Sequence, residues 1–263
     1  MTLVHNHNIV LFEKNKRRHL GIMSIKVFLS AFNIDDSKMK WGVRSLFLIL
    51  SALLTLALLF PLGDPDLSMV FNWYNDFLMG KADVNQLDYN TLIGNLIYTF
   101  SIQVLNYLCI SLALCTGAVF IYNRRKDKSP ELKKRVIKNT IILHLFLIVV
   151  FPLIYTIIAD MYIIFSLVAA FICLIACSYM SGDCGFGSSF PNAAKLFKKN
   201  IVTCLVNFIL VFGVFYFIGY GIDIIEEGHA YTTVVYPLRA IFQVYKCLVI
   251  GRLMGTVYLD AKE

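Results

Sequence analysis

Charged residues are scarce in this chain. Only 16% of the 263 residues are charged, and 58% are hydrophobic, whereas a soluble globular domain carries about 25% charged residues. A soluble protein of this size needs more polar surface than that to cover its core. The composition therefore excludes an ordinary soluble domain and indicates a membrane protein.

Sequence motifs for catalysis and for nucleotide or metal binding are also lacking. The glycines of residues 182–187 do not have the spacing of a phosphate-binding loop, and no Lys-Ser or Lys-Thr pair follows them. The cysteines of residues 173–184 have no histidine nearby in the sequence to complete a four-ligand zinc site. We therefore expect no enzyme activity, no metal and no cofactor.

Long hydrophobic stretches are what the sequence does have. A helix needs about 20 mostly apolar residues to cross a membrane. Six stretches approach or exceed this length: residues 46–62, 92–122, 140–158, 162–180, 201–222 and 234–259. The sixth contains Arg239, Lys246 and Arg252, so it stays open whether this helix spans the membrane or lies at its surface. We expect an all-α integral membrane protein with about six transmembrane helices, arranged as three helical hairpins with basic amphipathic cytoplasmic segments.

The segments between these stretches alternate in charge. Residues 1–45, 123–139 and 181–200 are basic, whereas the segments after residue 62, around Asp160 and after residue 222 are acidic. Lys and Arg accumulate on the cytoplasmic side of a membrane. We therefore expect a multipass plasma-membrane protein with both termini in the cytoplasm. The net charge of +7 is then explained by anionic lipid head groups, and no nucleic-acid partner is expected.

These features predict one membrane domain with short ends. Residues 1–44 form a basic cytoplasmic tail with an amphipathic helix, residues 45–259 the six-helix domain, and residues 260–263 a cytoplasmic C-terminus. Met23 is an alternative start of translation, which would leave residues 1–22 untranslated. The frequent use of Ile, Lys, Asn and Tyr favours a bacterial origin.

Two basic residues spaced i, i+4 precede the first, third and fifth hydrophobic stretches. Ser45, Asn139 or Asn200 follows each pair. This spacing places both cations of a pair on one helix face. The pattern fits either a threefold internal repeat or the basic flanks of any cytoplasmic helix end, and it predicts contact with anionic lipid or with a partner subunit. The six residues are Lys40, Arg44, Lys134, Lys138, Lys195 and Lys199.

The segment at residues 178–200 predicts a turn followed by a helix on the cytoplasmic membrane surface. Its glycines let the chain leave the fourth stretch, Ser188 or Ser189 can cap the next helix, and Pro191 is tolerated in a first turn. The lysines near the end of the segment lie opposite an apolar side, as in an interfacial helix.

The run FPNAAKLFKKNIVTCLVNFILVFGVFYF within this region resembles the bacterial multipass family that includes the membrane domain of some glycerophosphodiester phosphodiesterases. The resemblance covers residues 140–222 and implies a multipass membrane fold. It carries no active site to this chain, because the catalytic barrel of about 250 residues has no counterpart in the sequence.

Polar residues inside the hydrophobic stretches are the candidate functional residues, because hydrocarbon disfavours them. The second stretch carries a polar stripe that fits either hydrogen bonding between helices or the lining of a solute path. The sixth stretch carries a polar face that fits pairing with carboxylates such as Asp160, Asp223 or Glu226, or attraction of an anionic substrate or lipid. Gly251 and Gly255 predict close approach of another helix to the sixth stretch. The stripe is Asn95, Thr99, Gln103 and Asn106, and the face is Arg239, Gln243 and Lys246.

The sequence thus favours a structural or accessory component of an envelope or transport assembly, without a catalytic site. The alternative is the permease subunit of a transporter that uses a separate cytoplasmic ATPase, with the basic segments as its docking surface. A membrane enzyme that acts on lipid is a third hypothesis. Membrane lipid is the expected partner in every case.

Overall fold

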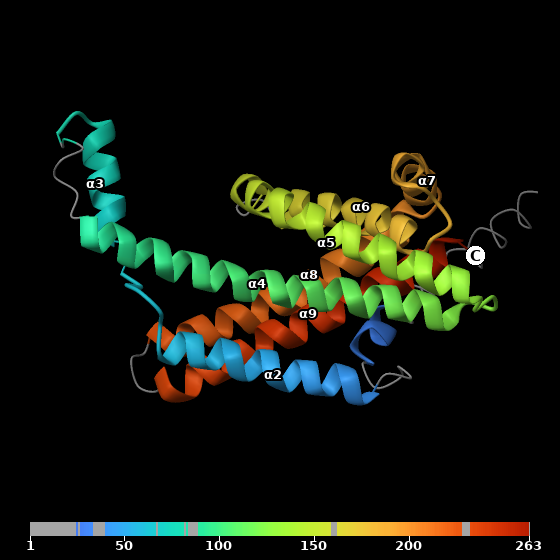
Figure 1. Ribbon diagram of the computed structural model, residues 1–263, viewed down its shortest axis with the longest axis horizontal. Coiled ribbons are helices and arrows are strands. Elements are labelled where there is room, and N and C mark those ends of the chain that lie inside the picture. The colour runs from blue at the N-terminus through green and yellow to red at the C-terminus, as the bar shows by residue number, and fades with distance from the viewer. Residues whose placement is uncertain are drawn as a thin grey trace, which may run out of the picture. The chain divides into compact units, whose positions relative to one another are not determined.

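The computed structural model describes residue 25 and residues 27–33, 40–66, 68–81, 83, 89–158, 162–227 and 232–262. These residues form helices joined by turns and irregular segments, and none of them forms a strand (Figure 1). After a helical segment at residues 27–32, the helices are α2 (Lys40–Leu59), α3 (Ser68–Leu78), α4 (Tyr89–Arg124), α5 (Pro130–Ile158), α6 (Tyr162–Met180), α7 (Phe186–Lys199), α8 (Ile201–Glu227) and α9 (Thr232–Lys262). The predicted all-α class is confirmed for this part of the chain. The alternative start at Met23 and the carboxylate of Asp160 lie outside it.

Three of these helices are long and apolar enough to cross a membrane: α4, α8 and α9. The 36 residues of α4 exceed what a hydrocarbon layer of about 30 Å requires at about 1.5 Å per residue. The sixth predicted stretch is one continuous helix of 31 residues, α9. These helices indicate a membrane location for the protein.

The helix α5 begins before the hydrophobic stretch that was predicted at residues 140–158. The basic segment at residues 123–139 is mostly helical, because α5 begins at Pro130, a residue that suits a first helical position. Ser129 caps this helix, and its Oγ accepts a hydrogen bond from the backbone N–H of Leu132 at 3.2 Å. Lys134 and Lys138 therefore lie on one helix, as their i, i+4 spacing predicts.

The start of α7 also differs from the prediction. The helix begins at Phe186, and its N-terminal capping position is Gly185, which has no side chain to bond the first N–H groups. The hydroxyls of Ser188 and Ser189 instead donate to the carbonyl oxygens of Gly185 and Phe186, at 3.1 and 2.6 Å. The prediction that a serine caps this helix, with Pro191 in the first turn, is wrong because the helix begins earlier.

Contacts within the chain divide it into two compact units. The first unit comprises residues 1–43, 111–218 and 246–263, and the second comprises residues 44–110 and 219–245. In the first unit, side chains of α6, α8 and α9 are almost fully buried, among them Met180, Phe208, Leu253 and Tyr258. In the second unit, the buried residues include Leu54, Val235 and Val244.

Glycines allow α4 and α9 to pack closely within the first unit. A Cβ atom at Gly251 would overlap the backbone carbonyl of Ala113, and one at Gly117 would lie 3.1 Å from the carbonyl oxygen of Gly251. A Cβ atom at Gly255 would lie 2.6 Å from the ring of Phe120. The close helix approach predicted from Gly251 and Gly255 is therefore confirmed, and the approaching helix belongs to the same chain.

Candidate functional site

The turn between α6 and α7 is the polar centre of the first unit. Asp183 in this turn accepts hydrogen bonds from Arg125, which follows α4, and from Lys262 at the end of α9, whose Nζ lies 2.7 Å from Oδ2. The hydroxyl oxygens of Ser181 and Tyr258 lie 3.3 and 3.5 Å from the same carboxylate oxygen. We call these five residues the Asp183 cluster. One carboxylate thus connects the ends of three helices.

Two cations surround the single carboxylate of this cluster. Partial burial by itself would raise the pKa of Asp183, but the hydrogen bonds and positive charges of Lys262 and Arg125 outweigh this effect and hold the pKa below its ordinary value. The carboxyl group is therefore ionised at neutral pH. It acts as a counter-ion between helices and cannot serve as a proton donor there.

Asparagine side chains satisfy helix-end carbonyl groups in the same unit. Such carbonyls have no partner within their own helix. Asn139 Nδ2 donates to the carbonyl oxygen of Tyr179 in the last turn of α6, at 2.7 Å, and Asn200 Nδ2 donates to that of Ala261 in the last turn of α9, at 3.1 Å. The two asparagines that follow the basic pairs thus perform the same task at two helix ends.

A further polar contact fastens α7 to the end of α6. Asn192 Nδ2 donates to Ser178 Oγ at 3.0 Å. Below α7, the ring of Phe171 on α6 meets the rings of Phe190 and Phe197 edge to face, with centroids 5.4 and 5.6 Å apart. These contacts hold α7 as a fixed part of the first unit.

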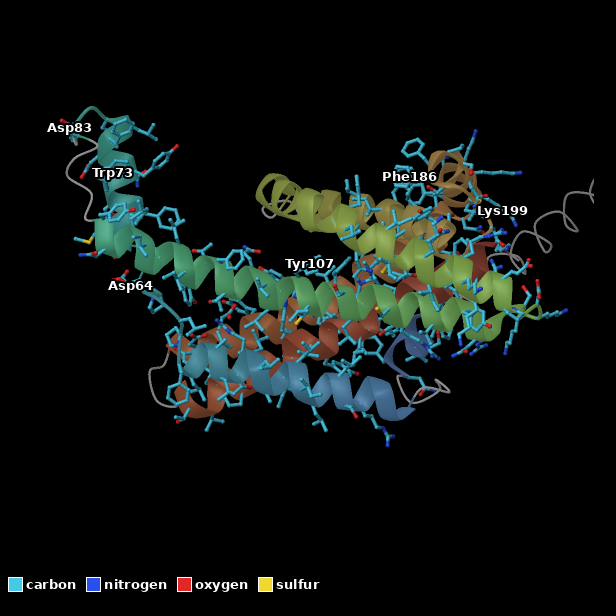
Figure 2. The ribbon with its side chains drawn as sticks, in the orientation of Figure 1. Asp64, Trp73, Asp83, Tyr107, Phe186 and Lys199 are labelled. Atoms are coloured by element: carbon cyan, nitrogen blue, oxygen red, sulfur yellow. The ribbon has the colours of Figure 1, made fainter. Side chains whose placement is uncertain are left out.

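The outer surface of α7 is both basic and apolar. Lys195, Lys198 and Lys199 are exposed at its end, and Phe186 and Phe190 near its start are 56% and 58% exposed. Figure 2 shows Phe186 and Lys199 at the two ends of this helix. Exposed aromatic rings beside lysines are typical of a helix at a membrane surface.

The other predicted basic pairs also lie on helices. Lys134 and Lys138 are exposed on the first turns of α5, and Arg44 is exposed on α2, whose first residue is Lys40. The i, i+4 spacing therefore does correspond to one helix face at each position. No interaction in the described part of the chain joins one pair to another.

The predicted polar stripe of α4 does not form one site. Asn95 is buried and its Nδ2 donates to the carbonyl oxygens of Asp64 and Asp66 at 2.9 and 3.1 Å, so it fastens the segment that follows α2. Thr99 and Gln103 are exposed and Asn106 is half-buried. The described residues offer these three side chains no hydrogen bond. The four residues thus share a helix face without sharing a task.

The predicted cationic face of α9 is also divided. Arg239 forms ion pairs with Asp223 and with Glu226, the latter at 2.5 Å, both on α8. Gln243 and Lys246 are half-buried, and neither is hydrogen bonded or ion paired to a described residue. Pairing with carboxylates therefore accounts for Arg239 and not for Lys246.

Arg252 is a residue whose surroundings the sequence did not indicate. Its side chain is buried, with the guanidinium carbon 4.1 Å from the centre of the Phe120 ring, and Nε donates to the carbonyl oxygen of Ser30 at 3.3 Å. The helical segment at residues 27–32 is thereby joined to α9 within the first unit. The charge of Arg252 has a structural role as a cation over an aromatic ring.

The Asp183 cluster was likewise not predicted, although the sequence held one signal for it. Asp183 is the single acidic residue among the bases of residues 181–200, and a lone carboxylate there is a natural partner for the arginine and lysine side chains of neighbouring helix ends. Its partners Arg125 and Lys262 lie far away in sequence, so spacing alone could not identify them.

The chemistry available at these sites is that of hydrogen bonding and ion pairing. Within the described residues, no three His, Cys, Asp or Glu side chains are grouped to hold a metal ion. The arrangement is suited to fixing helix ends and presenting a basic surface. No protein-family model matches the chain, and no curated protein or solved structure matches it significantly.

Proposed function

We propose that this chain is a non-enzymatic, multipass component of a bacterial plasma membrane that binds anionic lipid through α7. In this proposal six helices span the bilayer, both termini are cytoplasmic, and the protein is an accessory part of an envelope or transport assembly. The observation that carries the proposal is the combination found in α7. The helix is fastened to the bundle by Asn192 and the Asp183 cluster, yet it leaves its lysines and two aromatic rings exposed.

A lipid surface fits this combination well. Each lysine near an anionic membrane surface contributes about 1 kcal/mol of attraction, and exposed aromatic rings favour the interface between head groups and hydrocarbon. A helix that is already held in place loses little conformational entropy on contact. The exposed Lys134 and Lys138 of α5 extend the basic character of the same unit.

The experiment that tests lipid binding compares unfolding temperatures of the purified chain in detergent with added phosphatidylglycerol or phosphatidylcholine. We expect the anionic lipid to raise the unfolding temperature, because a ligand that binds the native state stabilises it. Replacing Lys195, Lys198 and Lys199 together by Gln should abolish most of this rise. Replacing Lys126 and Lys128 by Gln, both exposed outside α7, should leave it intact. Equal losses in the two variants would contradict a role for α7.

The orientation of the chain is tested in intact cells. A cysteine placed at Asp76 should react with a membrane-impermeant maleimide, and one placed at Lys128 should react only after the membrane is opened. External reaction at Lys128 would reverse the proposed topology.

The permease alternative rests on the same basic surface, with a cytoplasmic ATPase in place of lipid. It predicts that the chain purified in mild detergent retains a nucleotide-binding subunit, and that the triple Gln variant of α7 loses this subunit. Purification without such a subunit, together with lipid-dependent stabilisation, favours the accessory function.

A further inference from the structure

Cys115 is exposed, and it is the one cysteine with a histidine contact among the residues that the structure describes. All seven cysteines lie in described segments, and the remaining six are buried or half-buried. The Sγ atom of Cys115 on α4 lies 3.9 Å from Nε2 of His144 on α5. Both residues belong to the first unit. A thiol and an imidazole from two helices are thus brought together.

The contacts of His144 indicate which ring nitrogen carries the proton and which can act as a base toward the thiol. Nδ1 lies 2.6 Å from the carbonyl oxygen of Thr140, whereas Nε2 lies 3.4 Å from that of Ser111, so we assign the proton of the neutral ring to Nδ1, which makes the shorter contact. In the neutral ring, Nε2 then has a lone pair and can accept the thiol proton of Cys115. The base is therefore oriented by a third group, as nucleophile activation requires.

The surroundings can also hold the ring after it has taken that proton. Nε2 lies 3.4 Å from the carbonyl oxygen of Ser111, which can accept a hydrogen bond from the new N–H group. Both ring nitrogens of the imidazolium would then face carbonyl oxygens, with the thiolate beside them. The thiolate is the reactive form of a cysteine.

The position of the pair limits the kind of molecule that can reach it. Ile141 and Leu145, which flank His144 on α5, are 55% and 62% exposed, so the surrounding surface is apolar. The nearest charged residues along the two helices are Arg124 and Lys138, both cations. An apolar chain with an anionic head fits this combination.

We propose that Cys115 is a site of S-acylation, with a long-chain acyl thioester as the donor and His144 as the base. The sulfur of Cys115 attacks the thioester carbonyl carbon while His144 Nε2 takes the thiol proton. The bond between the carbonyl carbon and the donor sulfur then breaks, and His144 returns the proton to the leaving thiolate. The products are an acyl thioester at Cys115 and a free thiol, without any change of oxidation state. The protein is the acceptor of the group, so this site goes beyond the proposed lipid binding.

The test uses the purified full-length chain in detergent with palmitoyl-coenzyme A, and peptide mass spectrometry measures acylation at each cysteine. We expect Cys115 to be acylated faster than the half-buried Cys184, which has no histidine partner among the described residues. His144→Ala should slow acylation at Cys115 by about a hundredfold, the lower end of general-base assistance. Cys184 should react at an unchanged rate.

Added imidazole provides a second measurement. It should restore part of the Cys115 rate in His144→Ala, which a merely structural role of the histidine would not allow. If His144→Ala does not fold, the comparison of Cys115 with Cys184 in the natural chain decides the matter. Acylation of Cys115 no faster than that of Cys184, or a His144→Ala rate equal to that of the natural chain, would overturn the proposal.

Discussion

The ammonium group of Lys262 lies 2.7 Å from the carboxylate of Asp183, across a separation of 79 residues. This ion pair joins the last turn of α9 to the turn between α6 and α7. Because Arg125 bonds the same carboxylate, the end of α4 is fixed at the same point. The C-terminal end of α9 is therefore part of the packed structure of the first unit. Substitutions in the Asp183 cluster should change the free energy of unfolding of the protein.

Replacing Asp183 by Asn should destabilise the protein. The change removes the carboxylate that Arg125 and Lys262 share and leaves two cations close together. Hydrogen bonds to charged groups contribute about 1.5–3 kcal/mol each, and partial exposure of this cluster reduces that figure, so we expect a loss of about 1–3 kcal/mol in the free energy of unfolding. Thermal unfolding in detergent, followed by circular dichroism, measures it.

Asp76→Asn is the matched control for this change. Asp76 is exposed on α3, and its carboxylate makes no ion pair with a described residue, so its replacement should change the free energy of unfolding by less than about 0.5 kcal/mol. An Asp183→Asn variant as stable as Asp76→Asn would show that the cluster contributes nothing to stability.

The contribution of Asp183 to the free energy of unfolding should also depend on pH. Its pKa is lower in the folded protein than its ordinary value, which is about 3.9 for an aspartate in an unfolded chain. The stabilisation is therefore complete above that pH and is lost as the pH falls through the lower pKa of the folded state. The difference in unfolding temperature between the natural chain and Asp183→Asn should narrow below about pH 4. A difference that stays constant from neutral to acid pH would contradict the ion-pair account.

The sequence predicted helices well because their signals are local. Apolar runs of membrane-spanning length account for α4, α8 and α9, and the lysines of α7 were recognised from spacing within one turn or two. The spacing of Lys134 and Lys138 predicted a helix before residue 140, but hydropathy did not show that α5 begins at Pro130. Ser129 and Pro130 do indicate this start, because serine can cap a helix and proline suits its first position.

The polar contacts were predicted poorly because their partners are distant in sequence. Asn95 shares a helix face with Gln103, yet Asn95 is buried against Asp64 and Asp66. A helical periodicity identifies a shared face but not what another segment places opposite each residue. Asp223 lies only 16 residues from Arg239 and was named as a partner of the sixth stretch. Arg125 and Lys262 lie 58 and 79 residues from Asp183, and they were not named as its partners.

Close packing of α4 and α9 should be sensitive to a single methyl group. Gly251→Ala would place a Cβ atom against the backbone carbonyl of Ala113, which cannot move without shifting α4. Overpacking of this kind costs about 1–3 kcal/mol. Thermal unfolding in detergent should therefore show a lower midpoint temperature than that of the natural chain.

Gly187→Ala is the control that separates packing from helix propensity. Gly187 lies in α7 with no atom within 4 Å of an added Cβ, so alanine there should raise stability by up to about 1 kcal/mol. The two Gly-to-Ala changes thus have opposite expected signs. Stabilisation by Gly251→Ala would contradict the close approach of the two helices.

On the topology proposed above, we also expect α3 to lie at the outer surface of the membrane. At 100° per residue, its apolar residues cover an arc of about 200° and its polar residues, Asn72 and Asp76 among them, cover the rest. None of its side chains is buried within the chain. Within the second unit, the helix runs crosswise to the part of α4 at residues 89–110 (Figure 1). Trp73 lies on the apolar arc, and its Nε1 donates to the carbonyl oxygen of Asp83 at 3.1 Å (Figure 2).

Fluorescence quenching in lipid nanodiscs should locate this tryptophan at the membrane surface. The chain has two tryptophans, so Trp41→Phe leaves Trp73 as the single reporter. Its fluorescence should be quenched by lipids brominated high on the acyl chain and protected from acrylamide, because the apolar arc faces the bilayer. Moving the reporter to the polar arc, with Asn72→Trp in a chain that also carries Trp41→Phe and Trp73→Phe, should reverse both effects. If both reporters respond alike to acrylamide and neither responds to brominated lipid, α3 is exposed to water and does not contact the bilayer. Its apolar arc would then be a surface for a protein partner.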